Sequence, residues 1–360
     1  MECSICTGTC PVSRELPEFA PKQFIKRAVM KLDEDLIRSR EIWSCLSCGH
    51  CSVRCPAMID FPEFNRILRE KARKVNNLPV ESHHGIQQHV SRLQTRCHKQ
   101  NRTAWAEQVG EFQDSGDYFY FVGCLPYFDI TFRYLDLAPL NSAKSVLRLL
   151  NRMDITPVIS NDECCCGHDA LWSGDQATFL TLARQNLEVI KASGAKYVLF
   201  SCPEGYATFK NHYPKFFGKL PFTVIYMTAF LEQQIKHHPL SLRPSADNTV
   251  TFQDPCRLGR LSGDYESPRK LLKQIPNINL VEMERSRENA LCCGTSAWMA
   301  CTGCSKAIQT QRLHEAAETG ADTLITACPK CRIHLSCAQS GTDMELEIKD
   351  IYTYIDSHIK

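Results

Sequence analysis

Residues 323–331 have the sequence Thr323-Leu-Ile-Thr-Ala-Cys328-Pro329-Lys330-Cys331, in which an apolar, β-branched run leads into a cysteine and a proline. Residues 196–203 have the same form and end in Cys202-Pro203, 126 residues before the later pair. Apolar and β-branched runs of this length predict buried strands. The same pattern at a fixed interval predicts a duplicated unit.

Other segments repeat at nearly the same interval. The strand-like residues 118–124 and 250–256 end in Cys124 and Cys256, and Cys165-Cys166-Gly167 returns as Cys292-Cys293-Gly294 after 127 residues. In the first copy, residues 142–153 and 179–192 have helical patterns, and residues 157–159 have the pattern of a short strand.

Strands that alternate with helices predict parallel α/β layers. We therefore expect two duplicated α/β domains, residues 116–240 and 247–360. The boundary falls near residues 240–248, where Pro, Ser and Asp interrupt both patterns. Open parallel sheets bind ligands at the carboxyl ends of their strands, which is where the cysteines lie.

A different cysteine pattern lies nearer the N-terminus, Cys45-x2-Cys48-x2-Cys51-x3-Cys55-Pro56. In bacterial ferredoxins with this spacing, three closely spaced cysteines bind one [4Fe–4S] cluster and the cysteine before proline binds the other. Cys3-x2-Cys6-x3-Cys10-Pro11 matches the last three cysteines of the pattern. Exchanging ligands in this way gives one cluster with Cys45, Cys48, Cys51 and Cys10, and another with Cys3, Cys6 and Cys55.

The cluster of Cys3, Cys6 and Cys55 lacks a fourth cysteine, and two explanations remain open. It is a three-iron or non-cysteine-ligated centre, or the natural chain begins upstream of Met1. We favour the second, because a cysteine just before Met1 would complete the spacing.

Residues 1–75 are expected to form an all-helical two-cluster domain rather than the β-hairpins of small ferredoxins. Pro21 suits a first helical turn. Ile25, Val29, Leu32 and Leu36 then recur at helical spacing, and residues 64–74 have a helical pattern. The basic residues 76–115 are expected to be a helical linker, either a solvated connector or a docking surface for an acidic partner. The expected fold class is thus a multi-domain α+β chain.

Composition restricts the class of protein. The chain has 21 cysteines in 360 residues and a formal net charge of +2, which gives no argument for nucleic-acid binding. The N-terminal sequence does not resemble a signal peptide, and disulfide-rich secreted domains are usually much smaller. No apolar stretch is long enough to span a bilayer. We expect a cytoplasmic protein, with docking to a membrane subunit left open.

The second copy brings together Cys256, Cys292, Cys293, Cys328 and Cys331. Five thiolates are one more than a zinc ion or an ordinary cubane cluster takes. Adjacent cysteines do not easily bind one small ion in tetrahedral geometry, but they suit a larger cluster with several iron atoms.

These motifs resemble the cysteine-rich domain of heterodisulfide reductases, with a lone cysteine, then Cys-Cys-Gly, then Cys-Pro-x-Cys. The N-terminal pattern resembles the small two-cluster subunit of the same enzymes, so the chain resembles a fusion of the two. The resemblance implies a non-cubane [4Fe–4S] cluster on the five cysteines of the second copy, where a disulfide is reduced in one-electron steps. It also implies a flavoprotein or iron–sulfur partner, since no nucleotide-binding fingerprint for flavin or NAD occurs in the chain.

The first copy departs from this pattern, because Gly205 stands where the second copy has Cys331. Two interpretations of the first copy follow. It has an altered cluster site, in which the extra Cys164 completes the set of Cys124, Cys165, Cys166 and Cys202, or it has an empty site. We favour an empty or degenerate site, because Cys164 lies in the wrong segment to replace Gly205.

Several residues have weaker assignments. His168 and His334 are candidate proton donors or hydrogen-bond donors to sulfur, and Arg257 and Lys330 adjoin expected ligands. Cys301-x2-Cys304 is a candidate redox pair on an expected helix. The plainer interpretation of Cys97, Cys301, Cys304 and Cys337 is that they are small buried residues.

Three functions compete. The first is a disulfide-reductase-like catalytic subunit fed by the N-terminal clusters. The second is an electron-transfer subunit of a flavin-dependent glycerol-3-phosphate, glycolate or lactate dehydrogenase that delivers electrons toward quinone. The third, a zinc-stabilised interaction protein, explains the CxxC pairs but not the repeated Cys-Cys-Gly motif.

Overall fold

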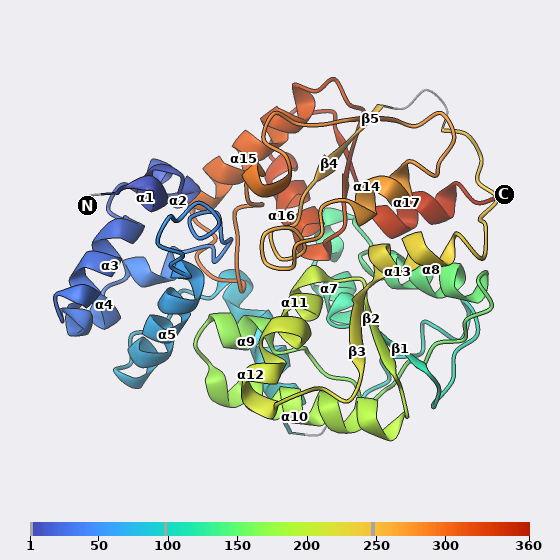
Figure 1. Cartoon of the computed structure of the whole chain (residues 1–360), viewed down its shortest axis with the longest axis horizontal. Helices are drawn as coiled ribbons and strands as arrows, with labels where there is room; N and C mark the ends of the chain where they lie inside the picture. Colours follow the sequence, from blue (N-terminus) through green and yellow to red (C-terminus); the bar gives the residue numbers. More distant parts are fainter. Residues whose placement is uncertain (1–2, 97–98, 246–248) are drawn as a thin grey trace.

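The computed structural model describes residues 3–96, 99–245 and 249–360. An N-terminal helical module precedes two α/β repeats, each built on its own parallel sheet (Figure 1). This is the fold class expected from the sequence. The expected boundary at residues 240–248 lies partly outside the described residues and stays a prediction.

The N-terminal module consists of short helices around an aromatic core. Phe19, Phe24 and Phe61 meet with ring centroids 5.3 to 6.3 Å apart. The helices are α1 (Ile5–Gly8), α2 (Pro11–Glu15), α3 (Pro21–Val29), α4 (Asp33–Arg38), η1 (Glu41–Trp43) and α5 (Phe61–Lys74).

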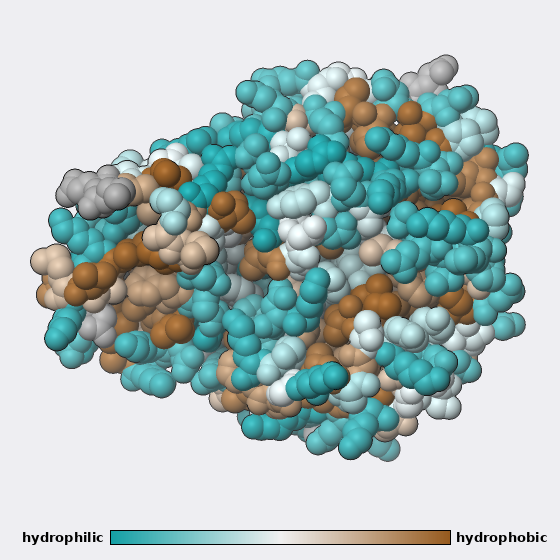
Figure 2. Space-filling model, in the orientation of Figure 1, coloured by the Kyte–Doolittle hydropathy of each residue, from teal (hydrophilic) through white to brown (hydrophobic). Residues whose placement is uncertain are grey.

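The prediction of one continuous helix after Pro21 is wrong. Lys31 has a φ of +59°, a left-handed conformation that separates α3 from α4. The apolar stripe is consequently split, since Leu36 is buried whereas Val29 is 78% exposed and Leu32 is 42% exposed. Figure 2 shows hydrophobic residues gathered on the surface of this module.

Within residues 76–96, helix α6 (Ile86–Gln94) is packed against other parts of the fold rather than being a solvated connector. The segment also contains η2 (Ser82–Gly85), and α6 buries Gln87, Gln88, Ser91 and Gln94. The side chain of Gln88 donates hydrogen bonds to the carbonyls of Ala297 and Trp298 in the second repeat. This segment is therefore packed between other parts of the fold.

The first repeat has the parallel strand order β1-β2-β3, and Phe119 pairs with Val198, which pairs with Val224. The short strand expected at residues 157–159 is reduced to bridges from Val158 to Phe119 and Gln113. The strands are β1 (Tyr118–Phe121), β2 (Tyr197–Phe200) and β3 (Thr223–Tyr226). The helices are α7 (Leu125–Thr131), η3 (Arg133–Leu135), α8 (Leu140–Asn151), α9 (His168–Trp172), α10 (Gln176–Ala192), α11 (Pro203–Asn211), α12 (Tyr213–Phe217) and α13 (Met227–Gln234).

The second repeat has the parallel strand order β5-β4-β6-β7, in which β4 and β6 correspond to β1 and β2. The strands are β4 (Thr249–Gln253), β5 (Asn279–Val281), β6 (Thr323–Thr326) and β7 (Glu347–Asp350). The helices are α14 (Ser267–Leu272), η4 (Arg287–Asn289), α15 (Gly303–Ala317), α16 (Pro329–Gln339) and α17 (Ile351–Ser357). Among the described residues, no helix combines the length and apolarity needed to cross a bilayer.

The two repeats share one hydrophobic core. The last helix of each repeat packs against a helix that follows the first strand of the other, α13 on α14 and α17 on α8 (Figure 1). Thr228 of α13 meets Ser267 of α14 with 2.6 Å between the hydroxyl oxygens, and the Nε of Arg148 donates to Asp356 of α17 at 2.8 Å. This arrangement turns the cysteine-bearing ends of the two sheets toward each other.

The N-terminal module docks onto both repeats. Helix α2 packs against α15 of the second repeat, and α5 packs against α9 of the first. The guanidinium of Arg69 in α5, fully buried, donates to the carbonyls of Ile42, Cys45 and Trp172 at 2.7 to 2.9 Å. Arg69 thus ties the Cys45–Cys51 loop to the first repeat.

Candidate iron–sulfur sites

The five cysteines of the second repeat converge at the carboxyl ends of β4 and β6. Cys256 lies in the turn after β4, Cys328 caps α16 and Cys331 lies in its first turn, while Cys292 and Cys293 come from the loop before α15. Their thiols form a continuous chain of hydrogen bonds from Cys256 through Cys292, Cys293 and Cys331 to Cys328. The structure therefore brings together the residues that the sequence assigned to one site.

Mutual hydrogen bonds and burial shift the pKa values of the thiols in this site. Hydrogen bonds from Cys292 and Cys331 lower the pKa of the Cys293 thiol well below its usual range, although burial opposes the shift. The hydrogen bonds that Cys292 makes to Cys256, Cys293 and Cys48 raise the pKa of Cys292. Five contacting thiols match the donor number and the crowding of a cluster with several iron atoms, and they exceed the four ligands of a zinc ion.

Glycine follows the paired cysteines for a steric reason. Gly294 has a φ of +80°, and a Cβ there would lie 2.7 Å from the carbonyl oxygen of Ser305. A side chain at this position would push α15 away from the loop that carries Cys292 and Cys293.

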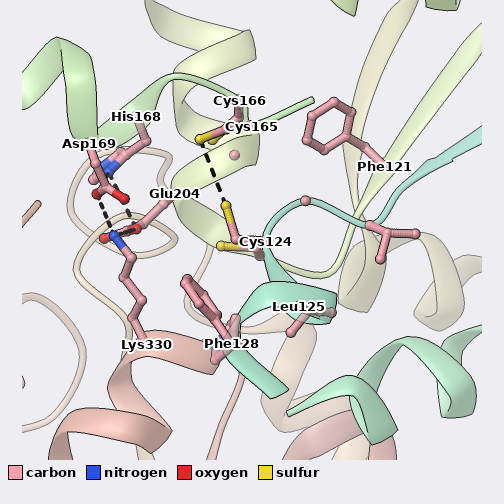
Figure 3. Close-up of a pocket in the computed structure, with 15 residues that line it drawn as sticks. Phe121, Cys124, Leu125, Phe128, Cys165, Cys166, His168, Asp169, Glu204 and Lys330 are labelled. Carbon is pink, nitrogen blue, oxygen red and sulfur yellow. Dashed lines mark hydrogen bonds and ion pairs between the residues drawn. The ribbon is translucent and has the colours of Figure 1, made fainter. Parts of the chain in front are cut away.

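The first repeat gathers its cysteines less completely (Figure 3). The sulfur atoms of Cys124 and Cys165 are 3.7 Å apart, and Cys165 also hydrogen-bonds with Cys166. For Cys202, burial raises the pKa of the thiol, and the charge of Cys328 in the second repeat adds to the shift. The thiol of Cys164 points instead toward the carbonyl of Leu182 at 3.4 Å, so it does not occupy the place of the missing fifth ligand.

A buried polar network of side chains from both repeats lies beside the first-repeat cysteines (Figure 3). Lys330 of the second repeat forms ion pairs with Asp169 and Glu204 of the first, at 2.6 Å for Glu204. His168 lies 3.0 Å from Asp169 and 3.3 Å from Glu204, and its Nε2 accepts from Arg257 at 3.1 Å. His168, Asp169 and Glu204 lie close enough together to hold a metal ion. The Lys330 ammonium forms ion pairs with Asp169 and Glu204 and so takes that place.

The charge state of this network follows from burial and pairing. Burial opposes a charge on Lys330, but Asp169 and Glu204 outweigh it and raise the pKa of the ammonium well above its usual range. Burial also opposes ionisation of Asp169, yet Lys330 and His168 hold the pKa of that carboxyl below its usual range. Burial lowers the pKa of His168, so the imidazole is neutral at pH 7.

In the N-terminal module, Cys10 joins Cys45, Cys48 and Cys51, as the exchanged ligation requires. All four are buried and line one cavity. Burial raises the pKa of Cys10 to about 12, and neighbouring Cys48 and Cys45 add to the shift. We call this set the inner site.

Cys3, Cys6 and Cys55 lie farther out in the same module. Cys6 has Cys55 as a charge neighbour, Cys6 and Cys55 are partly exposed, and Cys3 is exposed. We call this set the outer site. The structure thus groups Cys10 with Cys45, Cys48 and Cys51 and places Cys6 near Cys55, while the assignment of Cys3 to the outer site stays a prediction.

The inner site abuts the five cysteines of the second repeat. The thiol of Cys292 hydrogen-bonds with Cys48 and lowers the pKa of Cys48 to about 5, against the effect of burial. The backbone carbonyl of Cys48 accepts from the Nε of Arg260 at 2.8 Å, and that of Ser47 accepts from Arg257. Nothing in the spacing of the motifs predicted this contact.

The remaining candidates are distributed around these sites. His334 is buried with its ring 4.8 Å from that of Trp298, and burial lowers the pKa of its imidazole to about 4. Cys301 precedes α15 rather than lying on a helix, and its neighbours are Lys306 and Cys337, whereas Cys304 faces Glu15 and Glu18. Cys301 and Cys304 thus have different charge neighbours, and a redox pair between them stays a prediction. Cys97 lies outside the described residues.

Sequence reasoning missed the contribution of α6 to the first-repeat site. The amide oxygen of Gln94 accepts a hydrogen bond from the backbone N–H of Cys165 at 2.8 Å, and Ser91 also hydrogen-bonds with the Cys165 thiol. No motif marks these residues. The one available signal was a pair of uncharged glutamines, Gln87 and Gln88, within an otherwise basic stretch.

None of the cysteines that the structure describes forms a disulfide. Comparison with protein families matches residues 118–210 and 250–336 to the cysteine-rich domain, and residues 1–60 to the 4Fe-4S dicluster domain. The matched segments lie within the two repeats and the N-terminal module.

Two curated relatives cover most of the chain. One is a component of the dihydromethanophenazine:CoB–CoM heterodisulfide reductase of Methanosarcina acetivorans, 31% identical over 88% of this chain and 77% of its own length. The other, EtfAB:quinone oxidoreductase of Syntrophomonas wolfei, is 26% identical over 88% of this chain and 46% of its own length. Among solved structures, a hypothetical protein from Helicobacter pylori has the same fold with a TM-score of 0.53. It is 12% identical, with 92% of this chain and 65% of that one covered.

Proposed function

The chain belongs to the family of cysteine-rich iron–sulfur proteins that includes components of heterodisulfide reductase, and from that premise we propose that its second repeat reduces, or reversibly forms, a disulfide. Cys256, Cys292, Cys293, Cys328 and Cys331 would hold a non-cubane [4Fe–4S] cluster. When bound, such a cluster supplies one-electron chemistry at sulfur. The observation that carries the proposal is the unbroken chain of thiol contacts among these five residues.

The surrounding side chains suit this role. Arg257 and Arg260 follow Cys256 closely and turn toward the inner site, where their positive charges offset thiolate charge. Burial of Cys292, Cys293, Cys328 and Cys331 excludes water from the site. His334, whose charge neighbours include Cys293, is positioned to hydrogen-bond to a sulfur atom or a leaving thiolate.

Electrons would enter through the N-terminal module. The outer site lies nearest the surface, the inner site is buried, and the inner site contacts the second repeat through Cys48. Helix α3 packs against α1, which carries Cys6, and at the end of α3 Val29 and Met30 are exposed by 78% and 59%. Exposed apolar residues on the module that carries the outer site suit the docking of a flavoprotein or iron–sulfur partner. The free cysteines suit a reducing, cytoplasmic compartment.

The test is an anaerobic preparation of the full chain, examined by EPR with and without thiols and disulfides. We expect a paramagnetic signal that depends on added thiol and is lost in Cys292→Ser and in Cys293→Ser. Cys304→Ser, which alters a cysteine whose charge neighbours are Glu15 and Glu18, is the matched control and should keep the signal. Zinc in place of iron and sulfide would overturn the proposal.

A second candidate is an electron-transfer subunit that serves a flavin-dependent dehydrogenase and delivers electrons toward quinone. The absence of a cysteine at Gly205 and the similarity to a quinone oxidoreductase favour it. The same experiment separates the two functions, since a signal that responds to potential but to none of the thiols or disulfides tried would favour electron transfer alone.

A further inference from the structure

Glu204 and Lys330 occupy equivalent positions in the two repeats. Glu204 lies in Cys202-Pro-Glu-Gly205, and Lys330 lies in Cys328-Pro-Lys-Cys331. The carboxylate of Glu204 is 2.6 Å from the ammonium of Lys330, so the two residues pair with each other across the interface between the repeats. The residue directly before the fifth ligand position is thus acidic in the first repeat and basic in the second.

The first repeat is not built to complete a five-thiolate site. A Cβ at Gly205 would lie 3.1 Å from the ring of Phe200, and Phe200 stacks on Phe121 with centroids 5.1 Å apart. The second repeat has Thr326 and Gln253 at the positions of Phe200 and Phe121. Aromatic side chains therefore fill the space beside the missing ligand, and the five-thiolate cluster does not fit the residues of the first repeat.

The charges of the cross-repeat network balance. Lys330, Asp169 and Glu204 are all buried, and the two carboxylates contact the one ammonium. Arg257, also buried, supplies the second positive charge and is joined to both carboxylates through His168. Two cations and two anions leave the region neutral, and both cations lie on segments that carry ligands of the second repeat.

We propose that the first repeat acts as an electrostatic anchor, in which Glu204 and Asp169 hold and neutralise Lys330 and thereby set the reduction potential of the cluster in the second repeat. Lys330 is then a positioning residue between Cys328 and Cys331. The inference rests on the proposed function in one respect, namely that the five cysteines bind a redox-active cluster.

The physical reason is the low dielectric of a buried site. A charge there acts on a neighbouring cluster with little screening, and cluster potentials depend on the charge and hydrogen bonds around them. With Glu204 present, the positive charge of Lys330 is cancelled close to its source. Without it, that charge would stabilise the reduced cluster.

The test uses the full chain, loaded anaerobically with iron and sulfide, in a potentiometric titration followed by EPR. The signal of the second repeat is identified by its loss in Cys293→Ser. Glu204→Gln and Asp169→Asn should each shift the midpoint potential of that signal to more positive values. Glu204→Asp keeps the charge and should leave the potential close to that of the unmodified chain.

Asp356→Asn is the matched control. It removes another ion pair across the repeat interface, with Arg148, that lies away from the cysteines. It should lower thermal stability without moving the potential. An equal shift in Asp356→Asn, or no shift in both Glu204→Gln and Asp169→Asn, would overturn the anchor.

Failure of the anchor is distinguishable from failure of the proposed function. If the unmodified chain binds no iron on its second-repeat cysteines, the proposed function fails. If the cluster is present and its potential is indifferent to Glu204 and Asp169, only the anchor fails. If Glu204→Gln does not fold, the midpoint potentials of Asp169→Asn and Glu204→Asp still test the anchor.

Discussion

The thiol of Cys292 in the second repeat hydrogen-bonds with the thiol of Cys48 in the N-terminal module. These cysteines belong to different motifs and are far apart in the sequence, yet their side chains are neighbours in the fold. If both motifs bind clusters, a ligand of one cluster lies beside a ligand of the other. Short separation favours electron transfer between the two centres and gives the order outer site, inner site, second repeat.

This order predicts different effects for the substitution of Cys10 and the substitution of Cys55. Cys10 is buried with Cys45, Cys48 and Cys51, whereas Cys55 lies with Cys6 in the outer site. Cys10→Ser should remove the inner cluster and prevent reduction of the second repeat by an external donor. Cys55→Ser should remove or alter the outer cluster and leave the inner one intact. Iron content and EPR of the two variants measure the difference.

The result that would contradict exchanged ligation is loss of the inner signal in Cys55→Ser with retention in Cys10→Ser. That pattern would mean that each cluster takes its cysteines from one sequence motif.

A glycine shows how closely the N-terminal module approaches the first repeat. Gly174 has a φ of +76°, and a Cβ there would lie 2.7 Å from backbone atoms of Arg69 and Glu70 in α5. Gly174→Ala should lower the free energy of unfolding by about 3 kcal/mol, because left-handed strain and a backbone clash add. Urea denaturation of the full chain measures this loss.

Gly194→Ala is the matched control for Gly174→Ala. Gly194 has a φ of +74°, but a Cβ at this position would have no neighbouring atom within 4 Å. Only the conformational strain applies there, so we expect a loss of about 1 kcal/mol. Equal losses in the two variants would show that the module does not press on the turn at Gly174.

Much of the fold could be predicted from the sequence, because local patterns determine it. Strands that end in Cys124, Cys202, Cys256 and Cys328 follow from apolar runs, and the repeat follows from its interval. The membership of each cysteine set also follows from spacing. The assignment of those sets to particular clusters stays a prediction.

What could not be predicted depends on contacts between distant segments. The break at Lys31 changes the direction of one helix, and only the surrounding packing selects it. The burial of Gln88 and Gln94 depends on where α6 docks, and a polar helix has no apolar stripe to indicate this. The contact between Lys330 and Glu204 requires knowing how the repeats face each other.

Stability should depend on pH through His212. This residue is buried at the edge of Trp172, and burial, with a contribution from Lys215, lowers the pKa of its imidazole to about 3. An unfolded chain protonates histidine near pH 6.5, so the stabilisation is complete above that pH and is lost as the pH falls toward 3. His212→Gln should reduce the loss of unfolding free energy between pH 7 and pH 5 by about 2 kcal/mol.

Denaturant unfolding at the two pH values checks the His212 prediction. His237→Gln, which alters an exposed histidine, is the control and should keep the pH dependence of the unmodified chain. A His212→Gln variant with unchanged pH dependence would exclude His212 as its source.

The first repeat should accept a fifth ligand only when space is made for it. A thiol at residue 205 would face Cys166, since the Cβ position lies 3.9 Å from the Cβ of Cys166, as Cys331 meets Cys293 in the second repeat. The ring of Phe200 crowds that position at 3.1 Å. Gly205→Cys combined with Phe200→Thr reproduces the second repeat at both positions. The double variant should therefore bind more iron and sulfide per chain than the unmodified protein, and more than Gly205→Cys alone.

Phe200→Thr alone is the control for this double variant, because it removes a buried ring that also packs against Phe209 and should cost about 3 kcal/mol of stability. Its iron content should equal that of the unmodified chain. If the unmodified chain already binds as much iron as the double variant, the missing thiol at Gly205 does not limit the first repeat, and its four cysteines must hold a centre of their own.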